Sequence, residues 1–220
     1  HIIKIKKMDS KYWDKFYEKH SEDDGIRNCS SFAKFCYANY FRNNNLNIVE
    51  LGSGNGRDAI FFAKNNHNVI AIDQSTVAID YELSKLNDKY SQRLKPKATD
   101  FIDEKYENYE SIDVFYSRFT IHAITLEEEE ILIPRIYENL QVGGLFCVEV
   151  RTIKDKLFGK GKKCADNTFI TDHARRFINS QEFLKKMISL NFKLMFFTEE
   201  DNLSPYKDDN PVLMRIILQK

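Results

Sequence analysis

The sequence predicts an α/β protein built on a doubly wound, mostly parallel sheet of seven strands, with helices at the N-terminus and a basic loop inserted after the fifth strand. Three observations lead to this fold class. Strand-sized apolar runs alternate with amphipathic, helix-sized runs, which is the order of a parallel sheet covered by helices on both faces. The run IVELGSGNG at 48–56 leads from an apolar strand through three glycines into a helix. A chain of 220 residues with 42% hydrophobic residues is also long enough to bury one core of this kind.

The first part of the chain is expected to form two helices that precede the sheet. Residues 11–20, KYWDKFYEKH, form an aromatic, helix-like stretch, and residues 30–41, SSFAKFCYANYF, form a second one. Ser30 or Ser31 suits the N-cap of the second helix, and aromatic residues at helical spacing are expected to face a core. One domain is predicted over residues 1–220, made of an N-terminal helical cap at 1–45, a core at 46–150 and a C-terminal part at 151–220.

The glycine-rich turn indicates a binding site for a nucleotide-like ligand. Gly52, Gly54 and Gly56 lie between a strand that ends near Glu50 and a helical run that starts at Arg57. Glycine has no Cβ, so main-chain N–H groups come close to a ligand there, and the helix N-terminus favours an anionic group. A dinucleotide fingerprint requires a glycine at position 57, where this chain has Arg57, and this argues against NAD.

Two later strands end in acidic residues that suit the same ligand. The run HNVIAIDQS at 67–75 ends in Asp73, about 20 residues beyond the glycines, where an acid hydrogen-bonds ribose hydroxyls in nucleotide-binding folds. The alternative is that Asp73 only caps a helix, a role that Ser75 or Thr76 also suits. A third strand, in KPKATDF, leads to Asp100 and Phe101, although Asp103 and Glu104 compete for the same role.

The second half of the predicted sheet brings polar residues to strand ends. The run SIDVFYSRFT at 111–120 ends in aromatic and basic residues, and GGLFCVEVRT ends at Arg151. Between them, LEEEEILIPRIYENL has a helical period with an acidic first turn. After a long basic loop and a helix near residue 180, NFKLMFFTEE and NPVLMRIILQK are expected to pair as an antiparallel hairpin at the sheet edge.

The basic loop contains the cluster DHARRF, in which His173, Arg175 and Arg176 fall close together. Arginine forks bind phosphate oxygens in a bidentate manner. Together with Arg151, the cluster therefore predicts a site for an anionic substrate. The alternative is a set of surface charges that pair with nearby acids.

Composition bounds the classes of partner. Lys plus Arg and Asp plus Glu are 33 each, so no overall basic field favours nucleic acid or a membrane surface. The apolar runs are strand-sized and no signal sequence is apparent, so membrane insertion is not expected and the cytoplasm is the predicted location. The four cysteines lack metal-ligand spacing, and no metal site is predicted. The oligomeric state is left open.

The glycine-rich turn carries a family resemblance. Glu50, Gly52, Gly54 and Gly56 match (D/E)-x-G-x-G-x-G, motif I of the class I S-adenosylmethionine-dependent methyltransferases, and the chain resembles that family. The resemblance implies a Rossmann-like methyltransferase fold, S-adenosylmethionine as cofactor, S-adenosylhomocysteine as product, and methyl transfer as the reaction (EC 2.1.1).

The same resemblance implies where the cofactor binds. In the family the N-terminal helices close over the cofactor, the acid after the second strand binds ribose, and an acid beside an apolar wall after the third strand binds adenine. The residues placed at the cofactor in this way are Tyr12, Trp13, Arg27, Ser31, Glu50, Gly52, Ser53, Gly54, Gly56, Arg57, Asp58, Asp73, Gln74, Ser75, Asp100, Phe101 and Ser117.

A narrower resemblance concerns the methyl acceptor. The combination of YWDKFY, SSFAKF, YSRFTIHAI, EVRT and DHARRF looks like a bacterial group found with capsule and O-antigen assembly, whose members methylate a phosphate or phosphoramidate group. It implies a small-molecule or glycan-linked phospho acceptor. The residues expected to bind this acceptor are Arg151, His173, Arg175 and Arg176.

The end of the fourth strand faces the transferred methyl group in the family, which makes Tyr116, Arg118 and His122 the expected catalytic residues. A phospho oxygen is already anionic and needs no general base. A sugar hydroxyl or another small metabolite would make His122 the leading base, because a histidine pKa near 6.5 suits proton removal. A hydrogen-bonded core histidine is the other interpretation.

Two further classes of function stay open. A nicotinamide-dependent oxidoreductase would use the same kind of fold, but Arg57 in place of a third glycine argues against it. A noncatalytic module that binds S-adenosylmethionine or a partner shares the glycine-rich turn and has no need of converging acceptor groups.

Overall fold

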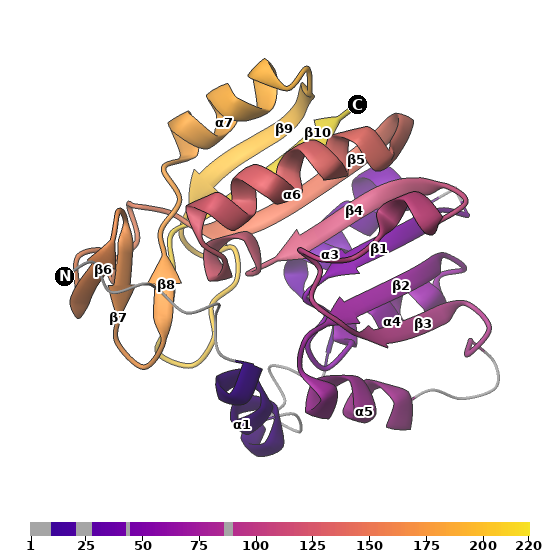
Figure 1. Ribbon diagram of the computed structural model, residues 1–220, viewed down its shortest axis with the longest axis horizontal. Helices are drawn as coiled ribbons and strands as arrows, with labels where there is room; N and C mark the ends of the chain where they lie inside the picture. Colours follow the sequence, from indigo (N-terminus) through magenta and orange to yellow (C-terminus); the bar gives the residue numbers. More distant parts are fainter. Residues whose placement is uncertain (1–9, 21–27, 43–44, 86–89) are drawn as a thin grey trace.

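The computed structural model describes residues 10–20, 28–42, 45–85 and 90–220. Seven strands form one sheet in the order β3-β2-β1-β4-β5-β10-β9 (Figure 1). The five strands from β3 to β5 run parallel, and β10 is antiparallel to both of its neighbours. The strands are β1 (Asn47–Leu51), β2 (Asn68–Asp73), β3 (Leu94–Ala98), β4 (Ile112–Arg118), β5 (Leu140–Arg151), β9 (Lys193–Glu200) and β10 (Leu213–Gln219). The predicted fold class and the C-terminal antiparallel pair are confirmed.

Helices cover both faces of this sheet (Figure 1). On one face, α6 and α7 bury side chains such as Ile133 and Phe183 against Phe115. On the other, α3 and α4 bury Phe32 and Phe62. The helices are α1 (Ser10–His20), α3 (Ser31–Cys36, continued by a π-helical turn at Tyr37–Phe41), α4 (Arg57–Lys64), α5 (Thr76–Ser84), α6 (Leu126–Asn139) and α7 (Ser180–Ser189), with 3₁₀ turns η2 (Tyr106–Asn108) and η3 (Ile121–Ala123).

Local sequence signals account for several helix starts. Ser30 is the N-cap of α3, where its Oγ accepts a hydrogen bond from the N–H of Ala33 at 3.0 Å. At α6, Thr125 and Glu128 form a reciprocal capping box at the start of the acidic first turn. These caps fix the points at which the chain enters the helices on either face of the sheet.

The basic segment after β5 differs from the loop expected from the sequence. It forms a separate antiparallel sheet of three short strands, β6 (Lys162–Ala165), β7 (Thr168–Ile170) and β8 (Ala174–Arg176). Phe158, Phe169 and Phe177 pack their rings together beneath it, and this small aromatic core lets so short a segment hold a fixed shape.

The small sheet and α1 both lie at the side of the main sheet where β1, β2 and β4 end (Figure 1). Ligands of open α/β sheets bind beyond the carboxyl ends of the parallel strands. The fold therefore places the glycine-rich turn, α1 and the basic cluster around one region. Among the helices that the structure describes, none is both long and apolar enough to cross a membrane.

Candidate functional site

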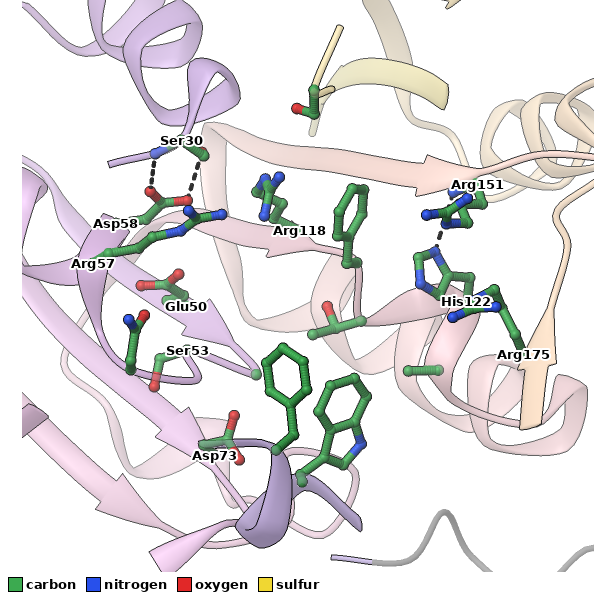
Figure 2. Close-up of a pocket in the computed structure, with 18 of the residues that line it drawn as sticks. Ser30, Glu50, Ser53, Arg57, Asp58, Asp73, Arg118, His122, Arg151 and Arg175 are labelled. Atoms are coloured by element: carbon green, nitrogen blue, oxygen red, sulfur yellow. Dashed lines mark hydrogen bonds between the residues drawn. The ribbon is translucent and has the colours of Figure 1, made fainter. Parts of the chain in front are cut away.

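A cavity of about 940 Å³ lies at the carboxyl ends of the parallel strands. Residues from α1, the glycine-rich turn, the end of β4, the small sheet and the 201–211 loop line it, and Figure 2 shows acidic and basic side chains turned into the same space. The residues predicted from the sequence that line it are Tyr12, Trp13, Ser31, Glu50, Gly52, Ser53, Arg57, Asp58, Asp73, Gln74, Asp100, Phe101, Arg118, His122, Arg151, His173 and Arg175.

The glycine-rich turn needs glycine at three positions. Gly52, Gly54 and Gly56 have φ angles of 70°, 57° and 73°, a region in which a side chain is strained. The N–H groups of Gly52 and Ser53 donate to the carbonyl oxygen of Ile72 at 2.7 and 2.9 Å. The turn is thus tied to the end of β2, and α4 starts directly after it.

Asp73 closes β2 and supports the turn. Its carboxylate accepts hydrogen bonds from the N–H of Gly54 and of Ser75, each at 2.8 Å. Burial raises the pKa of Asp73, and these two hydrogen bonds oppose the rise. Ser75 caps α5 and does not line the cavity, so the capping role falls to Ser75 while the Asp73 carboxylate faces the cavity.

Glu50 is a buried acid with an oxygen that could accept a hydrogen bond from a ligand. Its side chain is 4% exposed, and its Oε2 has no hydrogen-bond partner among the described residues. Burial raises the pKa of Glu50 well above its usual value, and nearby Asp58 adds to the rise. A buried carboxylate oxygen without a partner is costly, and a cationic or N–H donor group in the cavity would satisfy it.

Helix α1 covers the turn through a residue that the sequence analysis missed. Tyr17 is half-buried, and a Cβ at Gly54 would overlap its hydroxyl. Tyr17 lies one helical turn after Trp13, with ring centroids 6.3 Å apart, so i to i+4 spacing on the aromatic stretch was the available signal. Asp14 fixes the same helix by accepting a 2.6 Å hydrogen bond from the Ser75 hydroxyl.

Tyr116 does not reach the cavity, which corrects its expected place at the transferred methyl group. Its ring is fully buried against Phe32, and its hydroxyl donates to Asp58 at 2.8 Å. Asp58 also accepts hydrogen bonds from the N–H and Oγ of Ser30 at 2.6 and 2.7 Å (Figure 2). Tyr116 and Asp58 therefore fix the start of α3 to α4.

Other expected residues also lie outside the cavity lining. Ser117 is buried and shares a 2.5 Å hydrogen bond with Thr120. Gly54 and Gly56 are covered by Tyr17 and by Glu82. The prediction for Arg27 concerns a position outside the described residues.

Ser31 and Arg118 belong to a polar network in the middle of the site. Ser31 donates to the carbonyl oxygen of Leu203 at 2.6 Å and accepts from Arg215 at 2.7 Å, which holds the 201–211 loop over the cavity. Glu149 is fully buried between two arginines, with Arg118 Nε at 2.9 Å and Arg215 Nε at 2.5 Å. The charge of Arg118 is therefore paired with Glu149. Arg118 lines the cavity between the glycine-rich turn and the basic residues of the small sheet.

Arg151 and Arg175 occupy the far end of the cavity (Figure 2). Arg151 pairs with Asp155 at 3.0 Å and with Asp209. Arg175 donates through Nη2 to His173 Nε2 at 3.0 Å, and the same Nη2 lies 3.8 Å from the Asp172 carboxylate, while no hydrogen bond of Nε or Nη1 is found within the described part of the chain. Burial lowers the pKa of Arg175, and neighbouring Arg151 adds to the effect. Arg175 thus offers donors to a ligand.

His122 has a defined hydrogen-bonding state. Its Nδ1 accepts the main-chain N–H of Arg151 at 3.1 Å (Figure 2). Burial lowers its pKa well below 6.5, and Arg151, Arg175, His173 and Arg176 add to the effect. The ring is therefore neutral with its proton on Nε2, so it presents a donor to the cavity. This differs from the general base expected for a hydroxyl acceptor.

Arg176 lies on the opposite side of β8 from Arg175, which corrects its expected place at the acceptor. It lines a second cavity, also of about 940 Å³, between the small sheet, α6 and α7. Neighbouring residues of a strand point to opposite sides, and this separates the two arginines. In the first cavity Asp172 and Asp209, neither of them predicted, stand beside the basic residues.

Comparison with known proteins identifies the family. A family model described as a methyltransferase domain matches residues 42–200, which is most of the chain. The chain belongs to the methyltransferase domain family. Among curated proteins, this methyltransferase domain is 31% identical over 110 residues to a carboxy-S-adenosyl-L-methionine synthase of Staphylococcus epidermidis. The match covers 49% of the chain and 46% of that protein, so the chain spans about half the length of this relative.

Solved structures share the fold of this methyltransferase domain. A Burkholderia thailandensis 1,6-didemethyltoxoflavin-N1-methyltransferase, with bound S-adenosylhomocysteine, gives a TM-score of 0.72 at 16% identity over 96% of this chain and 87% of that one. The [4+2]-cyclase SpnF gives a TM-score of 0.67 at 13% identity over 90% of this chain and 84% of that one. Since a cyclase has the same fold, the reaction has to be argued from the cavity.

Proposed function

We propose that this protein is an S-adenosylmethionine-dependent methyltransferase that transfers a methyl group to an oxygen of a phosphate or phosphoramidate group, on a small-molecule or glycan-linked acceptor of the kind used in capsule assembly. The cofactor half of the proposal is supported by the glycine-rich turn, by Asp73 and by the unpartnered oxygen of Glu50. S-adenosylmethionine, when bound, supplies a sulfonium-activated methyl group. Glu50 suits its ammonium group and Asp73 its ribose hydroxyls.

The acceptor half is supported by the donor groups at the far end of the cavity. Arg175 has unused guanidinium donors, Arg151 lies beside it, and His122 presents Nε2–H. All three suit the oxygens of an anion. The hydrogen bond from the Arg151 N–H, which occupies His122 Nδ1 and leaves Nε2 as a donor, is the observation that carries the proposal. It favours an acceptor that is anionic on arrival over a hydroxyl that has to lose a proton.

Under this proposal the residues of the chain orient the reactants and exclude water. The guanidinium groups and His122 hold the non-reacting oxygens, so that one oxygen is directed toward the cofactor end. Tyr12, Trp13 and residues of the 201–211 loop line the same cavity. Orientation and exclusion of water supply most of the rate enhancement when the methyl group is already activated.

Calorimetry and kinetics test the two halves separately. We expect binding of S-adenosylmethionine and S-adenosylhomocysteine but not of NAD. With a panel of phosphorylated acceptors and their unphosphorylated counterparts, we expect methyl transfer only to the former. Arg175→Met should raise the acceptor KM or lower kcat by roughly 10- to 100-fold through loss of charged hydrogen bonds worth about 1.5–3 kcal/mol, with cofactor affinity retained. Arg175→Lys should restore little, because an ammonium cannot form the bidentate fork.

Lys160→Met is the matched control, because Lys160 is an exposed basic residue of the same segment and lines neither cavity. It should leave both constants unchanged. Under the alternative of a sugar hydroxyl or other small metabolite, unphosphorylated acceptors react and His122→Ala removes a pH-dependent limb of the rate. Full activity of both Arg175 variants would overturn the phospho-group proposal, and binding of S-adenosylmethionine without transfer to any acceptor would favour a noncatalytic module.

A further inference from the structure

The segment 121–124, which carries His122, separates the two cavities. His122, Ala123 and Ile124 line both of them. Ile121 and Ile124 anchor the ends of the segment in the core under α6. Between these anchors both cavities border the segment, so hydrogen bonds contribute to holding its main chain in place.

Arg176 makes those hydrogen bonds from the side of the second cavity. Its Nε donates to the carbonyl oxygen of Ile124 at 3.0 Å, and its Nη2 donates to that of Ile121 at 2.9 Å. One planar guanidinium thus spans both ends of the segment. Its Nη2 also lies 2.5 Å from Glu129 Oε2, and Lys186 of α7 holds the other oxygen of Glu129 at 2.9 Å. Arg176 is therefore itself held in place by α6 and α7.

On the side of the first cavity, the N–H of Arg151 at the end of β5 donates to His122 Nδ1 at 3.1 Å. The imidazole is held by this hydrogen bond and its main chain by Arg176. The charged or titratable groups around it are Arg151 from β5, His173 and Arg175 from the small sheet, and Arg176 itself. A movement of the segment would weaken the hydrogen bond to Nδ1 and free the imidazole to take the other tautomer.

We infer that Arg176 is a positioning residue, which fixes segment 121–124 from behind so that His122 presents Nε2–H to the acceptor. It acts through His122 and does not touch the acceptor. The inference rests on the proposed function for its effect on rate, whereas its effect on His122 does not depend on that function.

Arg176→Lys is the decisive variant. It keeps the positive charge, but one ammonium cannot take the place of a fork that spans two carbonyls and a carboxylate. Nitrogen-15 shifts of the histidine rings, with His122 identified by its loss in His122→Gln, report the tautomer. We expect a single Nε2–H tautomer in the wild type and a mixture in Arg176→Lys. Transfer to a phosphorylated acceptor should fall by roughly 10- to 100-fold in kcat, the effect typical of a misplaced group, with cofactor Kd unchanged within about twofold.

Arg93→Lys is the matched control. Arg93 also binds a main-chain carbonyl, that of Asn66 at 3.2 Å, as well as the side chain of Asn68 at 3.3 Å, and it lines neither cavity. It should leave the His122 signals and kcat as in the wild type. If the charge of Arg176 alone mattered, Arg176→Lys would behave in the same way, and the inference would be wrong.

Two further outcomes are informative. If Arg176→Lys does not fold, Glu129→Gln provides a second test, because it removes the charge that holds Arg176. It should shift the tautomer of His122 in the same direction by a smaller amount. An unchanged tautomer in Glu129→Gln would overturn the inference. A fall in kcat with unchanged His122 signals would also overturn it. Altered His122 signals in an enzyme that methylates no acceptor would instead refute the proposed function and leave the positioning role supported.

Discussion

Glu82, on α5 beneath the glycine-rich turn, gives a sharp prediction about stability. Its side chain is fully buried, its Oε2 accepts a 3.2 Å hydrogen bond from Ser53, and its Oε1 has no partner among the described residues. Burial raises its pKa to about 8, the Ser53 hydroxyl opposes the rise, and Asp73 adds to it. The folded protein therefore binds a proton that the unfolded chain releases above its ordinary pKa of 4.5.

The sign follows from this difference in bound protons. Because the folded pKa is raised, the contribution of Glu82 to stability is fully present below the unfolded value of 4.5 and is lost progressively as the pH rises toward about 8. At about 1.4 kcal/mol per pH unit over roughly 2.5 units, the loss at pH 7 amounts to about 3.5 kcal/mol. Glu82→Gln keeps the shape and removes the titration, so its free energy of unfolding should exceed that of the wild type by this order at pH 7.

Urea unfolding at pH 5, 6, 7 and 8, followed by circular dichroism, measures the difference. Glu130→Gln, on the exposed side of α6, is the control and should stay within about 0.5 kcal/mol of the wild type throughout. A Glu82→Gln difference that does not grow between pH 5 and pH 8 would show that Glu82 is not a buried proton-binding group, and a less stable variant at pH 8 would refute the reasoning.

Two predictions concern cofactor binding. Asp73→Ala removes the acceptor of the Gly54 and Ser75 N–H groups as well as the predicted ribose contact. Calorimetry should therefore show S-adenosylmethionine affinity reduced about tenfold or more. A change below about twofold would leave Asp73 a structural residue. Gly54→Val would strain a φ of 57° and overlap the Tyr17 hydroxyl, so it should abolish cofactor binding in a protein that stays folded. If displacement of α1 contributes to this loss, adding Tyr17→Leu to the Gly54→Val protein should restore part of the binding.

The glycine-rich end of the cavity could be predicted because its signals are local. The signals lie within a few residues of one another or at fixed distances along the chain. They are three glycines with positive φ, the acid that closes β2 and the helix that starts directly after the turn. Backbone geometry imposes these residue types whatever the rest of the fold does. Glu50, Gly52 and Asp73 accordingly line the cavity as expected.

The basic end of the cavity, at Arg151 and Arg175, could be predicted only in part. Arg175 and Arg176 are adjacent in the chain, and which of them faces the first cavity depends on the small sheet, which the sequence analysis took for a loop. Tyr116 lies on the same face of β4 as Arg118, but Phe32 of α3 covers it, whereas Arg118 at the strand end reaches the cavity. Asp172 precedes His173 in the same run, and Tyr17 follows Trp13 by one helical turn, so local signals for both were present. Asp209 comes from a distant segment, and no local pattern brings it to the site.

Helix α1 contacts both ends of the cavity. Asp14 ties it to Ser75 beside the glycine-rich turn, and Tyr12 ties it to Asp172 beside the basic residues, at 2.6 and 3.0 Å. A ligand that moves α1 at one end changes the free energy of binding at the other end, and thermodynamic linkage makes the two effects equal in size. If binding at either end shifts α1, the affinities at the two ends depend on each other, and each is then defined only at a stated concentration of the other ligand.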